Sequence, residues 1–565
     1  MLPEFDWIIV GGGSAGCVLA NRLSEDRAVR VLLLEAGRDT ALGLEPMLKS
    51  RYPGYAYFAA ANTWTGLSVL GGATGSNNPD QRPRFAYAQA RLLGGGSSIN
   101  GIGANRGSPA DYDEWVEHGA TGWGWEDVLP TFKALEQSSV EDQDYHGHHG
   151  LLPIRSVPPS DISRFVTEAA SVIAKRGVPR HADQNGLWQD GLFPTALNID
   201  AKGQRVSIAD AYLDTKVRSR DNLVLRTETS VARLLFEGQR AVGVELVDGT
   251  VLHARRIALS AGALHTPALL MRSGLGDPAL LQAMHLPVVA ERRGIGQNLM
   301  EHPYAGVMAH LPRASRLPLD AYHIPQVWRF SSGHGACPAG DMHLAMIGRS
   351  AWHAIGQRLG MMGVWVNKSY SRGHVSLASP HASVHPTVDF RLLSDPRDLI
   401  RLADAFRSAA KLMLDLAERG VCGAPMPARM SDRGRRYGQA TLKNRLATEA
   451  FGTLADWTGR LGPRLFDRSV DSGIGLQHLL SDETELHAFL NSSATGVWHA
   501  SGTCRMGRSD DPLAVTDARG NVMGVEGLHI ADASVFPTIP CANINIPTVM
   551  VAERMSALWR DQSGA

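Results

Sequence analysis

The chain has 565 residues, of which 44% are hydrophobic and 20% charged, a composition typical of a folded globular protein with more than one domain. Lysine plus arginine equals aspartate plus glutamate at 56 each, so neither a nucleic-acid-binding protein nor a highly charged disordered chain is expected. The start of the chain lacks signal-peptide features, no apolar run is long enough to span a membrane, and the five cysteines form no CxxC pair. We therefore expect a cytoplasmic protein without membrane insertion, zinc site or disulfide framework.

The first predicted elements are a strand, a glycine loop, a helix and a second strand. Residues 7–10 form an apolar strand, a GxGxxG loop follows at once, residues 17–23 have helical periodicity, and residues 29–34 form another apolar strand. This βαβ unit predicts a parallel sheet and a dinucleotide site, with the pyrophosphate at the helix N-terminus and an acidic side chain on the ribose. The residues expected to bind there are Gly11, Gly13, Ser14, Ala15, Gly16, Glu35 and Ala36.

The middle of the chain changes character several times. Residues 40–90 are predicted to form a long ordered excursion that wraps a ligand, and residues 223–260 alternate short strand-like runs with turns. Residues 306–469 contain a clear helix at 395–418, and glycine-rich strand-like sequence returns after residue 495. We therefore predict a discontinuous first domain over 1–155, 195–305 and 470–565, and a second domain over 156–194 and 306–469.

Three further segments carry a family resemblance. Residues 91–107 resemble the first signature of the glucose–methanol–choline (GMC) oxidoreductases, residues 260–276 resemble the second, and residues 294–302 resemble the G-x-N-L-x-D-H element, with Glu301 in place of Asp. The resemblance runs from residue 5 to about 558. It implies an α/β fold, α+β overall: a Rossmann-like FAD-binding domain and a substrate-binding domain built on an antiparallel sheet with helices.

The resemblance also implies how FAD is held. Asn100 and its neighbours would touch the flavin, and Val231 would meet the adenine through its main chain. Members with a histidyl-linked flavin have their covalent histidine at the position of Ile99, so noncovalent FAD is expected. Asp532, after a strand at 528–531, would bind the ribityl chain, and a helix over 548–559, whose first turn contains Pro547 as expected for an N1 proline, would direct its positive end at the flavin. The other residues expected to bind FAD are Arg91, Gly96, Ser97, Ile102, Trp498, Ala533, Asn545 and Thr548.

The reaction is predicted near the C-terminus. Oxidation of an alcohol needs a base for the hydroxyl proton while a hydride leaves carbon for flavin N5, and an imidazole is suited to that task. His499 and Asn543 resemble the catalytic pair of the family in its His/Asn version. The other histidines, including His302 and His265, are expected to be structural or on the surface.

Within the family, residues 365–368, 393–399 and 496–502 resemble the bacterial 5-hydroxymethylfurfural oxidase-like group. This implies oxidation of primary aromatic or furanic alcohols to aldehydes, and on to acids through the hydrate, with O2 reduced to H2O2. Trp365 and Trp498 would form aromatic walls, and Gly363, where such enzymes have Val, would widen the pocket. A dehydrogenase that uses a quinone or another acceptor remains open, as does a hydroxynitrile lyase, which can keep the base. The intact pair argues against a light-driven fatty-acid decarboxylase.

Overall fold

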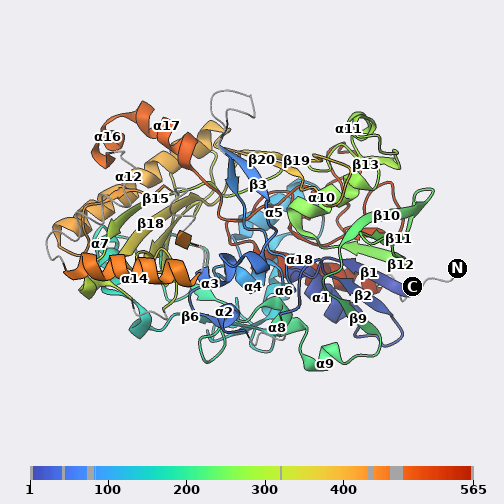
Figure 1. The fold of residues 1–565 in the computed structure, drawn as a ribbon, viewed down its shortest axis with the longest axis horizontal. Coiled ribbons are helices and arrows are strands. Elements are labelled where there is room, and N and C mark those ends of the chain that lie inside the picture. The colour runs from blue at the N-terminus through green and yellow to red at the C-terminus, as the bar shows by residue number, and fades with distance from the viewer. Residues whose placement is uncertain are drawn as a thin grey trace.

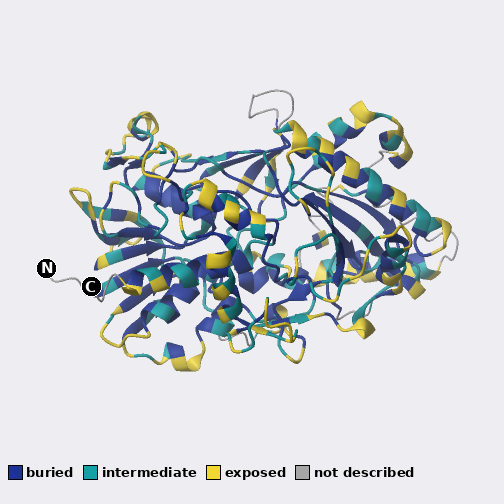
Figure 2. Cartoon of the chain, turned by 180° about the vertical axis from the view of Figure 1, so that it is seen from behind, coloured by how far each residue is buried: buried dark blue, intermediate teal, exposed yellow. Residues whose placement is uncertain are grey.

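A computed structural model describes residues 4–40, 45–72, 82, 84–317, 321–429, 437–438, 441–457 and 475–561. The ribbon consists of two halves, each built on one sheet, which lie side by side along the long axis of the molecule (Figure 1). Buried residues fill the strands of both sheets, and exposed residues follow the outer turns and helices (Figure 2). None of the helices among these residues is long and apolar enough to cross a membrane.

The first half is built on a seven-stranded sheet. Its parallel part joins β9, β2, β1 and β12, β22 also pairs with β12 in parallel, and β10 and β11 continue the sheet antiparallel. All four residues of β2 are buried, as expected for an inner parallel strand. The predicted βαβ unit and parallel sheet are confirmed. In sheet order the strands span Val231–Glu237 (β10), Arg240–Leu246 (β11), Val251–Leu259 (β12), Phe5–Val10 (β1), Val31–Leu34 (β2) and Leu223–Arg226 (β9), with Leu528–Ile530 (β22) beside β12.

The first and last helices of this half pack against each other. Helix α1 (Ser14–Leu23) contacts α18 (Asn545–Asp561), and at their N-termini the Ser14 hydroxyl donates to Asn545 Oδ1 over 2.7 Å. Helix α18 begins at Asn545, so Pro547 lies in its first turn, as predicted, but as its third residue and not at N1. Proline is tolerated there because the first four N–H groups of a helix have no partner within it.

The second half is built on a six-stranded sheet in which every pair is antiparallel, as predicted. In sheet order the strands span Met426–Pro427 (β21), Tyr304–His310 (β15), Leu359–Val366 (β18), Met342–Ile347 (β17), Gln326–Phe330 (β16) and Gly191–Pro194 (β7). The long helix α12 (Pro396–Glu418) contacts β15, β17 and β18, and Asp395 caps it by accepting a hydrogen bond from Arg397 N. This confirms the helix predicted over 395–418.

Two regions join segments from both predicted domains. Strand β3 (Ser68–Gly72) of the first pairs with β20 (Thr387–Leu392) of the second, and β4 (Arg84–Ala86) beside β3 and β19 (His374–Ser376) beside β20 complete that sheet. Helices α16 (Leu476–Ser481) and α17 (Glu483–Ser493) lie in the segment predicted to belong to the first domain, yet α17 packs against α12. Local composition does not reveal which helix a short helix will pack against, so this contact between the two predicted domains emerges only in the tertiary structure. The domain boundaries stay a prediction.

The remaining elements are short or lie around these sheets. The helices span Pro46–Lys49 (α2), Gly54–Tyr57 (α3), Gly96–Ile99 (α4), Pro109–Glu117 (α5), Trp125–Leu135 (α6), Arg164–Lys175 (α7), Ile208–Tyr212 (α8), Thr215–Arg218 (α9), Gly262–Arg272 (α10), Pro278–Ala283 (α11) and Leu442–Trp457 (α14). The strands span Glu136–Ser138 (β5), Leu152–Ser156 (β6), Ala196–Leu197 (β8), Leu275–Gly276 (β13) and Ala290–Glu291 (β14).

Candidate active site

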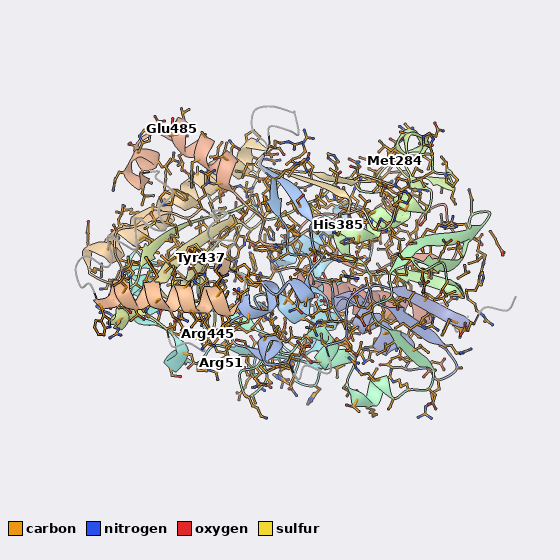
Figure 3. The ribbon with its side chains drawn as sticks, viewed as in Figure 1. Arg51, Met284, His385, Tyr437, Arg445 and Glu485 are labelled. Carbon is orange, nitrogen blue, oxygen red and sulfur yellow. The ribbon has the colours of Figure 1, made fainter. Side chains whose placement is uncertain are left out.

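A cavity of about 830 Å³ is lined by residues of both halves. His385, which lines it, lies near the middle of the molecule (Figure 3). The residues singled out from the sequence that line this cavity are Gly11, Gly13, Ser14, Ala15, Glu35, Ala36, Arg91, Gly96, Asn100, Val231, Trp365, Trp498, His499, Asp532, Ala533, Asn543, Asn545 and Thr548. Those that do not line it are Gly16, Ser97, Ile102, Pro547 and Gly363.

The glycine loop leaves room for a ligand at its middle glycine. A Cβ on Gly16 would lie 1.9 Å from the Gly11 carbonyl oxygen, so this glycine serves close packing rather than contact with a ligand. A Cβ on Gly13 would meet nothing nearer than 3.8 Å, and no side chain caps α1. The first N–H groups of α1 therefore remain available to an anion in the cavity, as at other pyrophosphate sites.

Glu35 is fixed by two backbone groups. Its carboxylate accepts hydrogen bonds from Gly12 N over 2.8 Å and Gly37 N over 2.7 Å, and burial raises its pKa. A carboxylate has about four acceptor sites, so it can still accept from the hydroxyls of a ribose.

The segment after Gly96 is held from behind by Arg205, which the sequence did not reveal. The buried Arg205 donates to Asn100 Oδ1 over 2.8 Å and to the Asn100 carbonyl over 2.6 Å. Ser97 also faces the protein, because its hydroxyl donates to Gly94 O over 2.6 Å and accepts from Ile208 N over 2.9 Å. The Ser97 hydroxyl thus shapes the loop, and the contacts of Ser97 and Ile102 with the cofactor stay a prediction.

Asp532 is anchored where β22 ends. Its Oδ2 accepts from Gly262 N over 2.8 Å and Thr266 Oγ1 over 2.6 Å, and its Oδ1 accepts from Ser534 N over 2.7 Å. Burial raises the pKa of this carboxyl. The group is therefore held rigidly at the cavity wall, where it can orient a polyol chain.

The cavity is also lined by residues that the sequence did not identify as part of the site. His265, expected to be structural or on the surface, lines the cavity and stacks on Trp64 with ring centroids 4.9 Å apart. Burial lowers its pKa to about 3. Arg272 also lines the cavity, and burial lowers its pKa to about 10.

His499 and Asn543, which are 44 positions apart, meet at the cavity wall. Asn543 Nδ2 lies 3.1 Å from His499 Nε2, and the Asn543 backbone is fixed by Asn105 Oδ1 over 3.0 Å. The pKa of His499 is lowered well below its usual value, mainly by burial and also by the neighbouring His302. The structure thus brings the predicted pair together, with a neutral imidazole beside an uncharged amide.

A second histidine completes this site. His302, expected to be structural or on the surface, is buried, and its Nδ1 lies 2.8 Å from His499 Nδ1. Its pKa is lowered to about 3, mainly by burial. The family element had marked the residue, but only the tertiary structure shows which ring it meets.

Glu301 holds both histidines through their backbones. Its carboxylate accepts from His302 N and His499 N, each over 2.9 Å, and from the Tyr87 hydroxyl over 3.1 Å. Burial raises its pKa to about 7. The neighbouring Trp498 has a φ of 63°, a conformation that costs free energy for a bulky residue, so the carboxylate clamps a strained segment. Glu301, His302 and His499 could be ligands of a metal by type, but these hydrogen bonds already engage them, and we assign no metal.

Aromatic side chains line the other end of the cavity. Trp365 is buried, and its ring centroid lies 6.4 Å from that of Tyr304. Trp498 is 45% exposed, and its ring centroid lies 6.3 Å from that of Tyr57. A Cβ on Gly363 would lie 2.6 Å from the Tyr304 ring. We had expected Gly363 to widen the pocket. It does not, because Tyr304 fills the space that the missing side chain leaves.

Comparison with known proteins agrees with this geometry. Two family models, each described as GMC oxidoreductase, match residues 5–304 and 369–552. The 5-(hydroxymethyl)furfural oxidase of Methylovorus sp. (strain MP688) is 40% identical over 98% of both chains. The oxygen-dependent choline dehydrogenase of Ectopseudomonas mendocina (strain ymp) is 31% identical and covers 100% of this chain and 95% of its own. The crystal structure of pyridoxine 4-oxidase from Mesorbium loti superposes with a TM-score of 0.80 at 27% identity over 99% of both chains.

The residues around the cavity fit the cofactor of this family. The uncapped N-terminus of α1, fixed carboxylates and a glycine-lined wall provide the groups that a flavin dinucleotide requires. The chain therefore belongs to the GMC oxidoreductase family, and it is an FAD-dependent enzyme of the group that contains alcohol oxidases and dehydrogenases.

Proposed function

We propose that the protein oxidises primary aromatic or furanic alcohols to aldehydes with FAD as cofactor and O2 as final electron acceptor. The observation that carries this proposal is the contact of 3.1 Å between His499 Nε2 and Asn543 Nδ2 at the cavity wall. A base and a neutral hydrogen-bonding group at one point are what removal of a hydroxyl proton requires. The 40% identity to a 5-(hydroxymethyl)furfural oxidase supports the choice of substrate.

In this proposal the chain moves one proton and orients one hydroxyl. Asn543 binds the hydroxyl oxygen of the alcohol, and His499 Nε2 accepts its proton. Bound FAD supplies the acceptor for the hydride that leaves the carbinol carbon. Burial keeps His499 neutral in the free enzyme, so it is ready to accept a proton. An aldehyde hydrate presents a hydroxyl to the same pair, which would extend the reaction to the acid.

The wall of the substrate end favours a flat, uncharged ring. The apolar side chains here are those of Tyr57, Tyr304, Met308, Met361, Trp365 and Trp498. Among the described residues that line the cavity, carboxylates come from Glu35 and Asp532, which we place beside the cofactor. No acid is left at this end to balance a quaternary ammonium group, so an aromatic alcohol is the better match than choline.

We also propose that FAD is bound without a covalent link at position 99. Ile99 is buried, lines the cavity and clusters with Leu48, Ala56 and Leu92. An isoleucine has no nucleophile with which to join the flavin. Acid precipitation should therefore release the yellow cofactor into the supernatant, whereas a flavin that stays with the precipitate would contradict this assignment.

One experiment tests the function. The purified yellow protein is mixed anaerobically with vanillyl alcohol, hydroxymethylfurfural or choline, and air is then admitted. We expect bleaching by the first two alcohols, followed by rapid recolouring with formation of H2O2. Bleaching with slow recolouring would assign a dehydrogenase that uses another acceptor, and an absence of bleaching with every alcohol would refute alcohol oxidation.

A further inference from the structure

Both ring nitrogens of His499 are in contact with protein groups, and these contacts restrict where its proton can lie. Nε2 is 3.1 Å from the amide nitrogen of Asn543, and Nδ1 is 2.8 Å from Nδ1 of His302. An amide NH2 group can only donate, so it requires a lone pair on Nε2. A neutral imidazole carries one proton, which must then be on Nδ1.

The contact between the two histidines needs one proton between the two nitrogens. If His499 Nδ1 carries it, His302 Nδ1 is the acceptor, and His302 carries its own proton on Nε2. That Nε2 is buried and has no hydrogen-bond partner among the described residues. The backbone groups that act on the ring, at Pro540 and Asn367, favour its protonated form. This surrounding suits an N–H better than a lone pair.

The opposite arrangement is penalised where His499 meets Asn543. His302 would then donate from Nδ1, while its buried Nε2 has no hydrogen-bond partner among the described residues in either arrangement. His499 would then carry its proton on Nε2, directed at the amide hydrogens of Asn543 over 3.1 Å. A buried polar group left without a partner costs about 1–3 kcal/mol, so the first arrangement dominates.

The backbone makes this arrangement rigid. Glu301 accepts hydrogen bonds from the N–H groups of both His302 and His499, each over 2.9 Å. The two rings meet edge to face, with centroids 5.0 Å apart and planes at 89°. One carboxylate thus fixes the distance between the rings, although the residues are far apart in the sequence.

We propose that His302 is a positioning residue that selects the Nδ1–H form of His499 and thereby keeps the lone pair of the base on Nε2. This rests on the proposed role of His499. When Nε2 takes the hydroxyl proton, the new charge is shared with His302 through the Nδ1–H bond. A hydrogen bond from a charged donor is worth more than a neutral one, so His302 also strengthens the base.

Two polar variants separate this role from a structural one. Asparagine can place its Oδ1 close to the position of the lost Nδ1 and accept the His499 proton, whereas glutamine places its polar group near the position of Nε2. We expect His302→Gln to lower the anaerobic bleaching rate at saturating vanillyl alcohol by about 10–100-fold, within the contribution expected for general base catalysis. His302→Asn should recover most of that loss, and the apparent Kd should be unchanged in both.

The pH profile gives a second measure. Loss of the acceptor destabilises protonated His499, so the acid limb of the bleaching rate should move to lower pH in His302→Gln and stay in place in His302→Asn. The titratable groups around the pair, which all variants retain, are Tyr87, Glu301, His343 and Lys368. His529→Leu is a matched control, because this buried histidine packs against Trp7 and Trp559 and does not line the cavity.

The outcomes are distinct. Equal rates and equal acid limbs in His302→Gln and the wild type would overturn the proposal, as would His302→Asn and His302→Gln losing activity equally. If His302→Gln does not bind FAD, His302→Asn is compared with the wild type and with His529→Leu. An acid limb in His302→Asn that differs from that of the wild type would then overturn the proposal. Failure of the wild type itself to bleach would refute the proposed function and not the role of His302.

Discussion

This molecule has two buried histidine clusters: the histidines are neutral in one, and the histidine is charged in the other. In the active site, His499 and His302 contact each other, and burial lowers the pKa of both. In the second cluster, His146 contacts Glu136 over 2.9 Å and Asp183 over 2.8 Å. Although burial alone would lower the pKa of His146, these carboxylates raise it to about 9.

The difference lies in the partners and not in the depth of burial. Arg106 lies 2.5 Å from Glu136, so Arg106 and protonated His146 balance the two carboxylates of their cluster. In the active site Glu301 binds backbone N–H groups and a tyrosine hydroxyl, and its own pKa is raised to about 7 by burial. A charged histidine suits a structural ion cluster, whereas a neutral one can act as a base.

The largest expected effect comes from removing the neutral histidine that faces the cavity. His499→Ala should lower the rate of anaerobic bleaching by about 10²–10⁴-fold, the range for loss of a general base. The FAD content should stay that of the wild type. Stopped-flow measurement with vanillyl alcohol checks this, and a variant that bleaches as fast as the wild type would contradict the assigned base.

The charged histidine should matter for stability instead. His146→Leu leaves Glu136 and Asp183 with fewer partners, and breaking a buried ion cluster costs about 3 kcal/mol. Because the folded pKa of about 9 exceeds the usual 6.5, the stability contributed by protonation of His146 is complete below pH 6.5 and is lost as the pH rises through 9.

Chemical denaturation at several pH values measures this contribution. The gap between the wild type and His146→Leu should be widest near pH 6 and should narrow above pH 9. The bleaching rate per bound flavin should not change. If His146→Leu slowed bleaching as much as His499→Ala does, the division between a structural and a catalytic histidine would fail.

A smaller effect is expected at the amide partner. Asn543→Leu removes a hydrogen bond to a group that becomes charged, worth about 1.5–3 kcal/mol, which corresponds to about 10–100-fold in bleaching rate. Asn543→His should retain most of the rate because an imidazole can also donate. Equal losses in both variants would show that the site depends on the shape of asparagine and not on its hydrogen bond.

The smallest effect concerns Glu301. Its folded pKa of about 7 lies above the ordinary value of 4.5, so the folded state binds a proton more tightly than the unfolded one. Stability from this proton is present below pH 4.5 and is lost as the pH rises through 7. Between pH 6 and 8 the wild type should lose about 1 kcal/mol in unfolding free energy from this group, and Glu301→Gln should remove that loss. An unchanged pH dependence in the variant would place the carboxyl outside this range.

Local patterns predicted much of the fold. The apolar strands around Gly11 to Gly16 and the helix over 395–418 follow from periodicity and capping, because these signals depend on neighbours along the chain. The packing of α17 against α12 did not follow from these signals, since it depends on surfaces far away in the sequence.

The sequence by itself determined the chemistry of the site: a dinucleotide loop, a histidine and an asparagine in a family arrangement. Only the tertiary structure decided which neighbours each buried histidine contacts and whether that histidine is charged. His302 and His146 look alike as residues, but one faces another imidazole and the other faces two carboxylates. The pKa of a buried group depends on desolvation and on neighbours within a few ångströms, and those neighbours come from distant parts of the chain.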